Sequence, residues 1–366
     1  MSVSELDNYR PPEEPRRKRK GKGHRRASGS AFRRGGDGSR EMPMVPEPEF
    51  TSYYGRPIVK APPWEKEIGA YLFLGGLAGG SSILAFGAEL TDRPLLRRNM
   101  RLSAITAASL GTVALVTDLG RPERFLNMMR TIKPTSPMSL GSWLLAYYAT
   151  HAGVAAAAEV DRVTHSKLPL GPFRPVLRFV DRPAAAGAAV LGAPLAAYTA
   201  VLLGDTAVPT WNAMHKDLPF VFVSSASLAA GGLAMLTTPI SETAPARTFA
   251  LAGVAGELVA MHLMKERMDP VAVEPLEQGR PGTWLMWSER LAIAGAAGTI
   301  LGGRRRWVAA LSGAVLVASS ALTRFGVFQA GKDSVKDPKY TVEPQRNRLA
   351  KRRAAGITDD SITTAG

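Results

Sequence analysis

The chain has 366 residues, a formal net charge of +15 and no cysteine. The absence of cysteine excludes disulfides, thiolate zinc sites, cysteine-ligated iron–sulfur clusters and a cysteine nucleophile, so any such centre belongs to a partner. The mean hydropathy of −0.03 is that of a soluble protein only on average, because an apolar block between polar tails gives the same value. The positions of the basic residues decide whether nucleic acid, anionic lipid or an acidic partner is expected.

Residues 1–60 form a tail rich in Pro, Gly, Arg and Lys without apolar periodicity. Its run RRKRKGKGHRR cannot bury a core and predicts disorder. No apolar region follows the run, so it is not a signal peptide. The run also lacks the interleaved aromatic residues that stack on bases, which favours membrane lipid over nucleic acid as its partner.

Eight apolar segments follow this tail. They cover residues 68–90, 100–119, 138–160, 183–204, 218–238, 246–264, 288–302 and 307–327. Most reach the roughly 20 residues that cross a bilayer, and most lack the polar face of a soluble helix. The seventh is the shortest, but it pairs with the eighth across the turn GGRRRW. The sequence predicts an all-α, polytopic integral membrane protein with eight transmembrane helices over residues 61–330, followed by a polar, disordered tail over 331–366.

Eight crossings place both tails on one side of the cell membrane. A basic N-terminal arm is hard to translocate without a signal, which favours a cytoplasmic location for the tails. The Lys and Arg residues of the short loops mildly favour the opposite orientation. The side on which any functional site lies therefore stays open.

Ionisable residues in lipid cost about 2.5 kcal/mol or more and are functional candidates. Asp118 ends the second segment in LVTDLGRPERF, where Arg121 can hold it ionised. The alternative is a capping and salt-bridge cluster that only fixes the loop. Helix alternation brings Asp118 to one face of the membrane with aromatic and polar residues: Trp64, Glu67, Tyr71, Arg121, Ser136, Trp143, Tyr198, Trp211, Asn212, His215 and His262.

An acid, an arginine, a tyrosine hydroxyl and a histidine at one face suit a quinone, whose carbonyls accept hydrogen bonds and whose reduction takes two protons. A b-type haem held by two histidines is the competing interpretation. His151 lies roughly 20 Å from this face by helical rise, whereas His262 lies only a few residues from it, so no haem is predicted.

Three motifs resemble the NrfD/polysulfide-reductase membrane-subunit family over residues 62–330: EIGAYLFLGGLAGGSS, DLGRPERFLNMMRTIKPTSPMSLGSW and YTAVLLGDTAVPTWN. The resemblance implies an eight-helix subunit without cofactors of its own that binds menaquinone or another quinone. It also implies a 4Fe-4S ferredoxin-like partner subunit, which connects to a molybdopterin catalytic subunit. Asp118 and Tyr198 match the family's quinone-contacting acid and tyrosine, although Ala200 replaces the usual glycine after this tyrosine.

These observations predict a quinone-reactive membrane anchor of a multi-subunit oxidoreductase. Asp118 would give or accept a proton, Tyr198 would bond a quinone carbonyl and Arg121 would tune Asp118. The residues predicted to line or gate the pocket are Glu67, Trp211, Asn212 and His215. Two alternatives remain: a proton-coupled transporter with Glu257 and His262 as a relay, and a purely structural anchor. The substrate of the catalytic partner and the direction of electron flow stay open.

Overall fold

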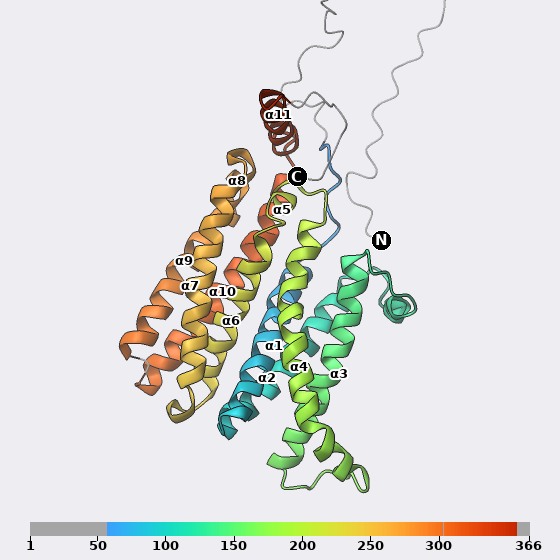
Figure 1. Cartoon of the computed structure of the whole chain (residues 1–366), viewed down its shortest axis with the longest axis vertical. Coiled ribbons are helices and arrows are strands. Elements are labelled where there is room, and N and C mark those ends of the chain that lie inside the picture. The colour runs from blue at the N-terminus through green and yellow to red at the C-terminus, as the bar shows by residue number, and fades with distance from the viewer. Residues whose placement is uncertain (1–56, 303, 357–366) are drawn as a thin grey trace, which may run out of the picture.

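The computed structural model describes residues 57–302 and 304–356, whose regular structure is entirely helical. Eight long helices form the body (Figure 1): α1 (Lys66–Leu90), α2 (Pro94–Thr117), α3 (Pro137–Val163), α4 (Phe173–Gly204), α6 (Leu218–Thr237), α7 (Ala244–Arg267), α9 (Gly279–Gly302) and α10 (Arg306–Ser334). Shorter helices lie between or after them: η1 (Pro122–Met129), α5 (Pro209–Ala213), η2 (Ile240–Glu242), α8 (Pro270–Glu277) and α11 (Lys339–Ala354).

The eight predicted segments coincide with the eight long helices, apart from differences at their ends. The prediction for the seventh segment was too short, because α9 begins nine residues before position 288. Five helices, α1, α2, α4, α6 and α10, are long and apolar enough to cross a membrane. The all-helical fold and its membrane-spanning character are confirmed, and crossing by α3, α7 and α9 stays a prediction.

The predictions of disorder for the two tails have different outcomes. The disorder expected for residues 1–60 falls almost wholly outside the described residues. The disorder expected for 331–366 is wrong for residues 339–354, which form α11. Strong helix formers such as Arg, Lys, Leu and Ala fill this segment, and Lys339 pairs with Glu274 of α8 at 2.6 Å. A polar composition therefore accompanies an ordered helix here.

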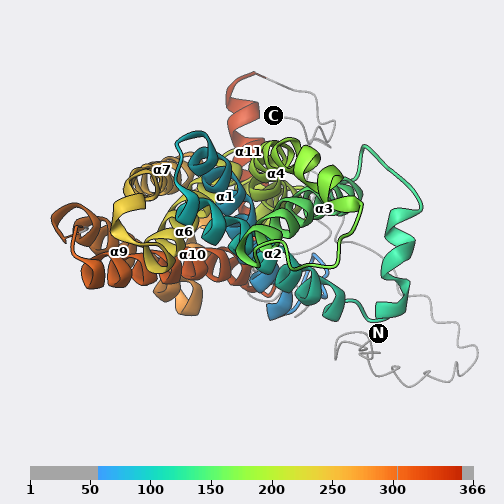
Figure 2. The same ribbon diagram turned by 90° about the horizontal axis from the view of Figure 1, so that it is seen from below.

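The long helices form two halves that meet at α1 and α6 (Figures 1 and 2). Helices α2, α3 and α4 gather with α1, and helices α7, α9 and α10 gather with α6. Glycines bring the helix backbones together, as small residues do in membranes. A side chain on Gly79 would strike the carbonyl of Gly192 in α4, and one on Gly80 would meet the carbonyl of Ala226 in α6 at 2.7 Å. Close helix packing therefore depends on the absence of a side chain at these two positions.

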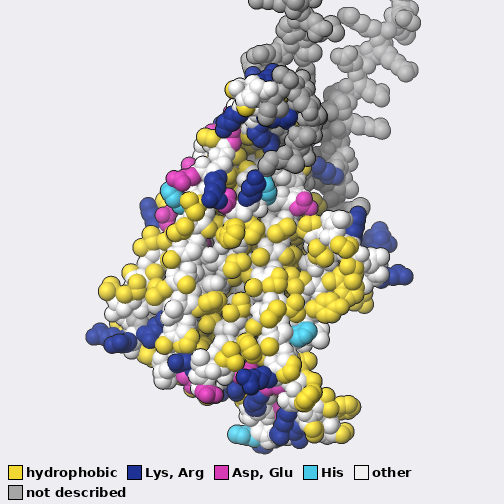
Figure 3. Space-filling view, viewed as in Figure 1, with side chains coloured by type: hydrophobic (Ala, Val, Ile, Leu, Met, Phe, Trp, Pro, Cys, Tyr) yellow, Lys and Arg dark blue, Asp and Glu magenta, His cyan; other side chains and the backbone are white. Residues whose placement is uncertain are grey.

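Apolar and charged side chains occupy different levels of the molecule. Figure 3 shows a hydrophobic band across the middle, with charged side chains gathered above and below it. We call the upper level in Figure 1, which carries α5, α8 and α11, the site end, and the opposite level the far end. Asp118 and the start of α1 lie at the site end, as helix alternation predicted.

Candidate functional site

Asp118 follows directly after α2 at the site end and is half-buried. Its Oδ1 accepts a hydrogen bond from the backbone N–H of Glu65, at 3.1 Å. Burial raises the pKa of Asp118 above that of an ordinary aspartate, and the negative charges of Glu67 and Glu65 act in the same direction. The bond from Glu65 and the positive charge of Lys332 oppose this rise. Asp118 is thus suited to hold and release a proton.

Glu67 lies in the first turn of α1 and supplies the second carboxylate. Its Oε2 is buried and has no hydrogen-bond partner among residues 57–302 and 304–356. A buried carboxylate oxygen without a partner is costly, so it calls for a ligand or a water molecule. Glu67 and Asp118 therefore form an acidic pair at the site end, where α1 begins and α2 ends.

A pair of tyrosines lies deeper than this acidic pair. Tyr71 is one turn below Glu67 on the same face of α1, and its hydroxyl is hydrogen-bonded to the hydroxyl of Tyr198 from α4. The Tyr198 ring packs against Gly141 of α3, where any side chain would collide with it. Three half-buried leucines pack against the hydrophobic cluster that contains Tyr71: Leu74, Leu115 and Leu144. Acidic, phenolic and apolar groups are thus combined within two helical turns.

An aromatic stack fixes the neighbouring end of α10. Trp64 stacks on Trp211 of α5 with ring centroids 5.8 Å apart, and Trp211 stacks on Phe328 at 5.6 Å. Trp211 is fully buried and its Nε1 donates to the carbonyl of Val327 at 2.9 Å. Lys332 Nζ donates to the carbonyl of Trp64 at 2.6 Å. The stack therefore connects Lys332 to the segment that precedes α1.

Residues 59–332 match the protein family described as Polysulphide reductase, NrfD. The chain belongs to this family. A search of curated proteins gave no match. The NrfD-family chain is an integral membrane subunit of polysulphide reductase-type complexes, and its family implies an oxidoreductase complex as partner. Because the sequence lacks cysteine, no cysteine-ligated iron–sulfur cluster lies in this subunit.

The other predicted site residues of the NrfD subunit lie at its surface. Asn212 of α5 and His215, which follows α5, are exposed. Asn212 Nδ2 donates to the carbonyl of Gly204 at 3.2 Å, and the backbone carbonyl oxygen of Asn212 lies 2.8 Å from His215 Nδ1. Arg121 is exposed and immediately precedes η1. The cation that acts on Asp118 is Lys332, and Arg121 as its tuning group stays a prediction.

Sequence reasoning did not select Lys332 and did not commit to Tyr71. Tyr71 stood on the expected face and within the motif EIGAYLFLGGLAGGSS, but it was given no role. Lys332 was assigned to the tail because the predicted membrane domain ended at residue 330, whereas α10 continues to Ser334. The alternation of eight helices already brings this last turn to the site end, and that was the signal available.

Glu257 and His262, the relay of the transporter alternative, are not brought together in the NrfD subunit. Glu257 is buried and accepts a hydrogen bond from Thr323 Oγ1 of α10. His262 is exposed, and its Nε2 lies 3.2 Å from Glu266, one turn along the same helix. Arg324, fully buried beside Glu257, is the charged neighbour that sequence reasoning missed.

Proposed function

We propose that this subunit binds a quinone at the site end, with menaquinone as the leading candidate. The supporting observation is the combination of two carboxylates, Asp118 and Glu67, with the Tyr71–Tyr198 hydroxyl pair one turn deeper. A quinone has an apolar ring and two carbonyl acceptors, which this combination of leucines, phenols and acids matches in type. The 4Fe-4S ferredoxin-like subunit and the molybdopterin subunit would be its redox partners.

In the proposed chemistry, the electrons and the protons come from different groups. Reduction of one quinone takes two electrons from the iron–sulfur partner and two protons from titratable groups, and quinol oxidation reverses both. Tyr198 donates a hydrogen bond to one carbonyl, while Asp118 gives or accepts a proton at the reacting oxygen. Glu67 holds the neighbouring negative charge that keeps Asp118 protonated to higher pH.

The remaining predicted residues fit supporting roles. Trp211 uses its only donor on Val327, so it positions α5 rather than bonding the quinone. Asn212, His215 and Arg121 are exposed, which suits them to gate the site or contact the partner subunit. Lys332 supplies the cation that Arg121 was expected to supply.

The test is Asp118→Asn in the intact complex. We expect quinone-coupled turnover to fall at least 100-fold, within the range that general acid–base groups contribute, while the complex still assembles. Asp205→Asn is the matched control, because Asp205 is an exposed aspartate just after α4 at the same end. Wild-type turnover in the Asp118 variant would overturn the role of this acid.

A pH profile gives a second measure of the same group. Burial raises the pKa of Asp118, so the protonated form persists to higher pH than in an exposed aspartate. The rate of quinone reduction should fall as pH rises through this raised pKa, because the protonated form is then lost. The same limb should vanish in Asp118→Asn, whose residual rate depends on other groups.

Two measurements address the alternatives. A gently purified complex that contains no quinone, and that shows no quinone-coupled turnover, would support a purely structural anchor. Substrate uptake by the isolated subunit in liposomes would support a transporter. The exposed position of His262, which contacts Glu266, does not support the relay with Glu257 that first suggested the transporter.

A further inference from the structure

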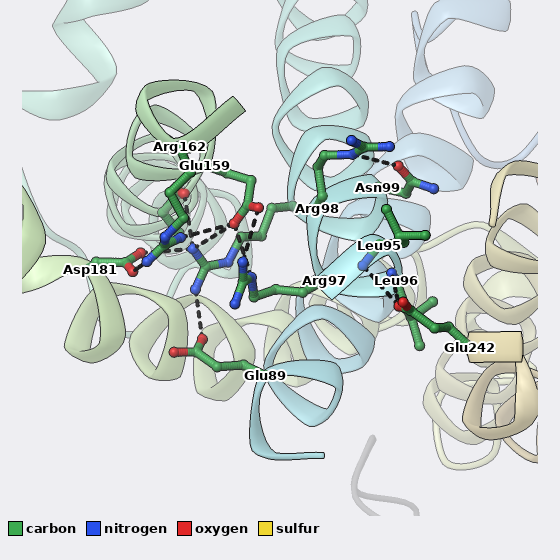
Figure 4. Close-up of polar contacts among 12 residues, drawn as sticks. Glu89, Leu95, Leu96, Arg97, Arg98, Asn99, Glu159, Arg162, Asp181 and Glu242 are labelled. Atoms are coloured by element: carbon green, nitrogen blue, oxygen red, sulfur yellow. Dashed lines mark hydrogen bonds and ion pairs between the residues drawn. The ribbon is translucent and has the colours of Figure 1, made fainter. Parts of the chain in front are cut away.

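Buried charges in the body of this subunit lie beside opposite charges of the same chain. At the far end, Glu89, Glu159 and Asp181 gather around arginines (Figure 4), and Arg101 of α2 lies 2.6 Å from Glu89 and 2.7 Å from Asp181. At mid-depth, buried glutamate 257 lies beside a buried arginine of α10. Such pairing offsets part of the cost of removing a charge from water. A charge at this depth without a partner in the chain therefore points to a partner outside it.

Glu289 and Arg290 of α9 are two such charges. Both are exposed, and among residues 57–302 and 304–356 neither forms a hydrogen bond or an ion pair. Arg290 has a ring contact, with its Cζ 5.5 Å from the centroid of the Trp287 ring. Side chains of consecutive residues on a helix do not face each other, so Glu289 and Arg290 are poorly placed to pair with one another.

Both charges lie at mid-depth in the hydrophobic body. They stand near the middle of the 24 residues of α9. Their neighbour Ser288 has its Oγ 2.5 Å from Oγ1 of Thr323, and Thr323 donates to Glu257. This part of α9 is therefore level with the buried Glu257–Arg324 pair and not with either end of the bundle. An ionisable side chain that faces lipid at this depth is costly, which marks the position as a functional or contact site.

The face of α9 that carries these charges is otherwise apolar or small. Its exposed residues recur at spacings of three and four, which keeps them on one side of the helix: Thr283, Met286, Glu289, Arg290, Ile293, Ala294, Ala297 and Ile300. Alanines let a neighbouring helix approach closely in a membrane. A polar position within an apolar helix face fixes the register of the pair that forms on it. The face therefore has the composition of a helix contact.

The position of α9 leaves this face uncovered. The helix lies at the edge of the bundle (Figures 1 and 2) and packs chiefly against α10, with α7 and α8 as further neighbours. On the side towards α10 the packing is close, because a Cβ on Gly295 would lie 2.6 Å from the Leu316 side chain. The exposed face is the one that these three helices do not cover.

The charges of this face are complementary to those of an identical face. Two copies inserted in the same orientation form a closed pair about a two-fold axis perpendicular to the membrane, which keeps both α9 helices parallel and at the same depth. Because the acid and the arginine are adjacent in sequence, the acid of each copy comes opposite the arginine of the other. Two equivalent ion pairs form, and both charges leave the lipid. An anionic lipid headgroup would serve the arginine alone.

We propose that the exposed face of α9 is the interface between two copies of this subunit in the membrane, with Glu289 of each copy paired to Arg290 of the other. The inference does not depend on the proposed quinone function. The interface lies in the half formed by α6, α7, α9 and α10, whereas Asp118 and the Tyr71–Tyr198 pair lie in the other half. Dimer formation therefore adds no residue to the quinone site.

Cysteine cross-linking tests the contact directly, because the natural chain contains no cysteine. Ala297→Cys places a thiol on the proposed contact face. Oxidation of membranes that contain the intact complex should then join two copies of this chain in a product of twice 39.0 kDa. The matched control is Val190→Cys, at a position of α4 that is 73 % exposed, and it should give only a minor fraction of this product. Equal yields from the two variants would overturn the interface, as would a cross-link from Ala297→Cys to a different protein.

Charge reversal in the Ala297→Cys background tests the ion pairs. Glu289→Arg and Arg290→Glu each bring like charges face to face, so each should lower the yield of the cross-link about 10-fold or more. The double variant restores opposite charges and should recover the yield. The amount of assembled subunit is measured in each membrane, so that poor insertion is not counted as loss of contact. A double variant as low as the two singles would overturn the pairing.

The mass of the unmodified complex, purified in mild detergent, tests the interface should the charge variants fail to assemble. We expect two copies of this chain in each particle. A particle with one copy, together with no cross-link from Ala297→Cys in membranes, would overturn the proposal. Quinone-coupled turnover reports separately on the proposed function, since it should be the same in Ala297→Cys and Val190→Cys.

Discussion

The two halves of the subunit hold buried charge in opposite ways. In the α1–α4 half, the charges gather at the far end, where Arg101 contacts three carboxylates within 3.2 Å. In the α6–α10 half, Glu257 and Arg324 lie about ten residues inside their helices, at mid-depth. Within the described part of the chain, Arg324 donates one hydrogen bond, to the backbone carbonyl of Phe222 at 2.5 Å. Its Cζ lies 3.8 Å from the centroid of the Phe222 ring.

The space beside the buried charges differs as well. The first half has alanine-lined room beside Arg101 and open space at Gly75. Both halves contain close glycine contacts: a Cβ on Gly79 would strike the carbonyl of Gly192, and one on Gly232 of α6 would lie 2.7 Å from the carbonyl of Gly313 in α10. Room beside the paired charges of the first half can admit water, whereas close packing of α6 and α10 suits fixed helix association. The difference assigns rigidity to the second half.

The largest expected effect comes from Arg101→Met. Three carboxylates would lose their shared cation, and removing one partner of a buried ion pair costs about 3–5 kcal/mol. We expect the largest drop in the melting temperature of the detergent-solubilised complex, or failure to assemble. Arg182→Met, at an exposed position of α4, is the control. An unchanged melting temperature would mean that the neighbouring arginines suffice.

Arg324→Met should cost less, about 3 kcal/mol, because Arg324 has one hydrogen bond and acts on Glu257 through its charge. The double variant with Glu257→Leu should recover much of this loss, since no buried charge is then left alone. Melting temperatures of the two single variants and the double variant form the cycle. A double variant whose loss equals the sum of the losses of the two singles would show that the two charges do not depend on each other.

The helices were predictable because uninterrupted apolar runs of bilayer length have few other solutions. Asp118 was selected as an acid at the end of an apolar segment, its role and that of Tyr198 came from motif resemblance, and topology placed both at one end. Helix alternation could have placed Lys332 at the site end, but its action on Asp118 and the pairing of Glu257 with Arg324 were not predictable, because they depend on which helices become neighbours. The ordered α11 was missed because polar composition was taken as disorder, although its residues favour helix and its Lys339 has a partner in α8.

Gly232→Ala tests the close packing of the second half. The added methyl would meet the carbonyl of Gly313 at 2.7 Å, so the helices must move apart. Overpacking of this kind costs about 1–3 kcal/mol. We expect a lower melting temperature with normal quinone affinity. A stability equal to that of the wild type would show that α6 and α10 separate easily, and the assigned rigidity of this half would be lost.

Gly75→Ala should change stability least, and in the opposite direction. A Cβ there meets nothing within 4 Å, while replacing glycine inside a helix stabilises by about 0.5–1 kcal/mol through the unfolded chain. The melting temperature should therefore stay equal or rise slightly, against the fall expected for Gly232→Ala. A loss as large as in Gly232→Ala would mean that the space beside Gly75 is closed. The α1–α4 half would then be packed as closely at this position as α6 and α10 are at Gly232.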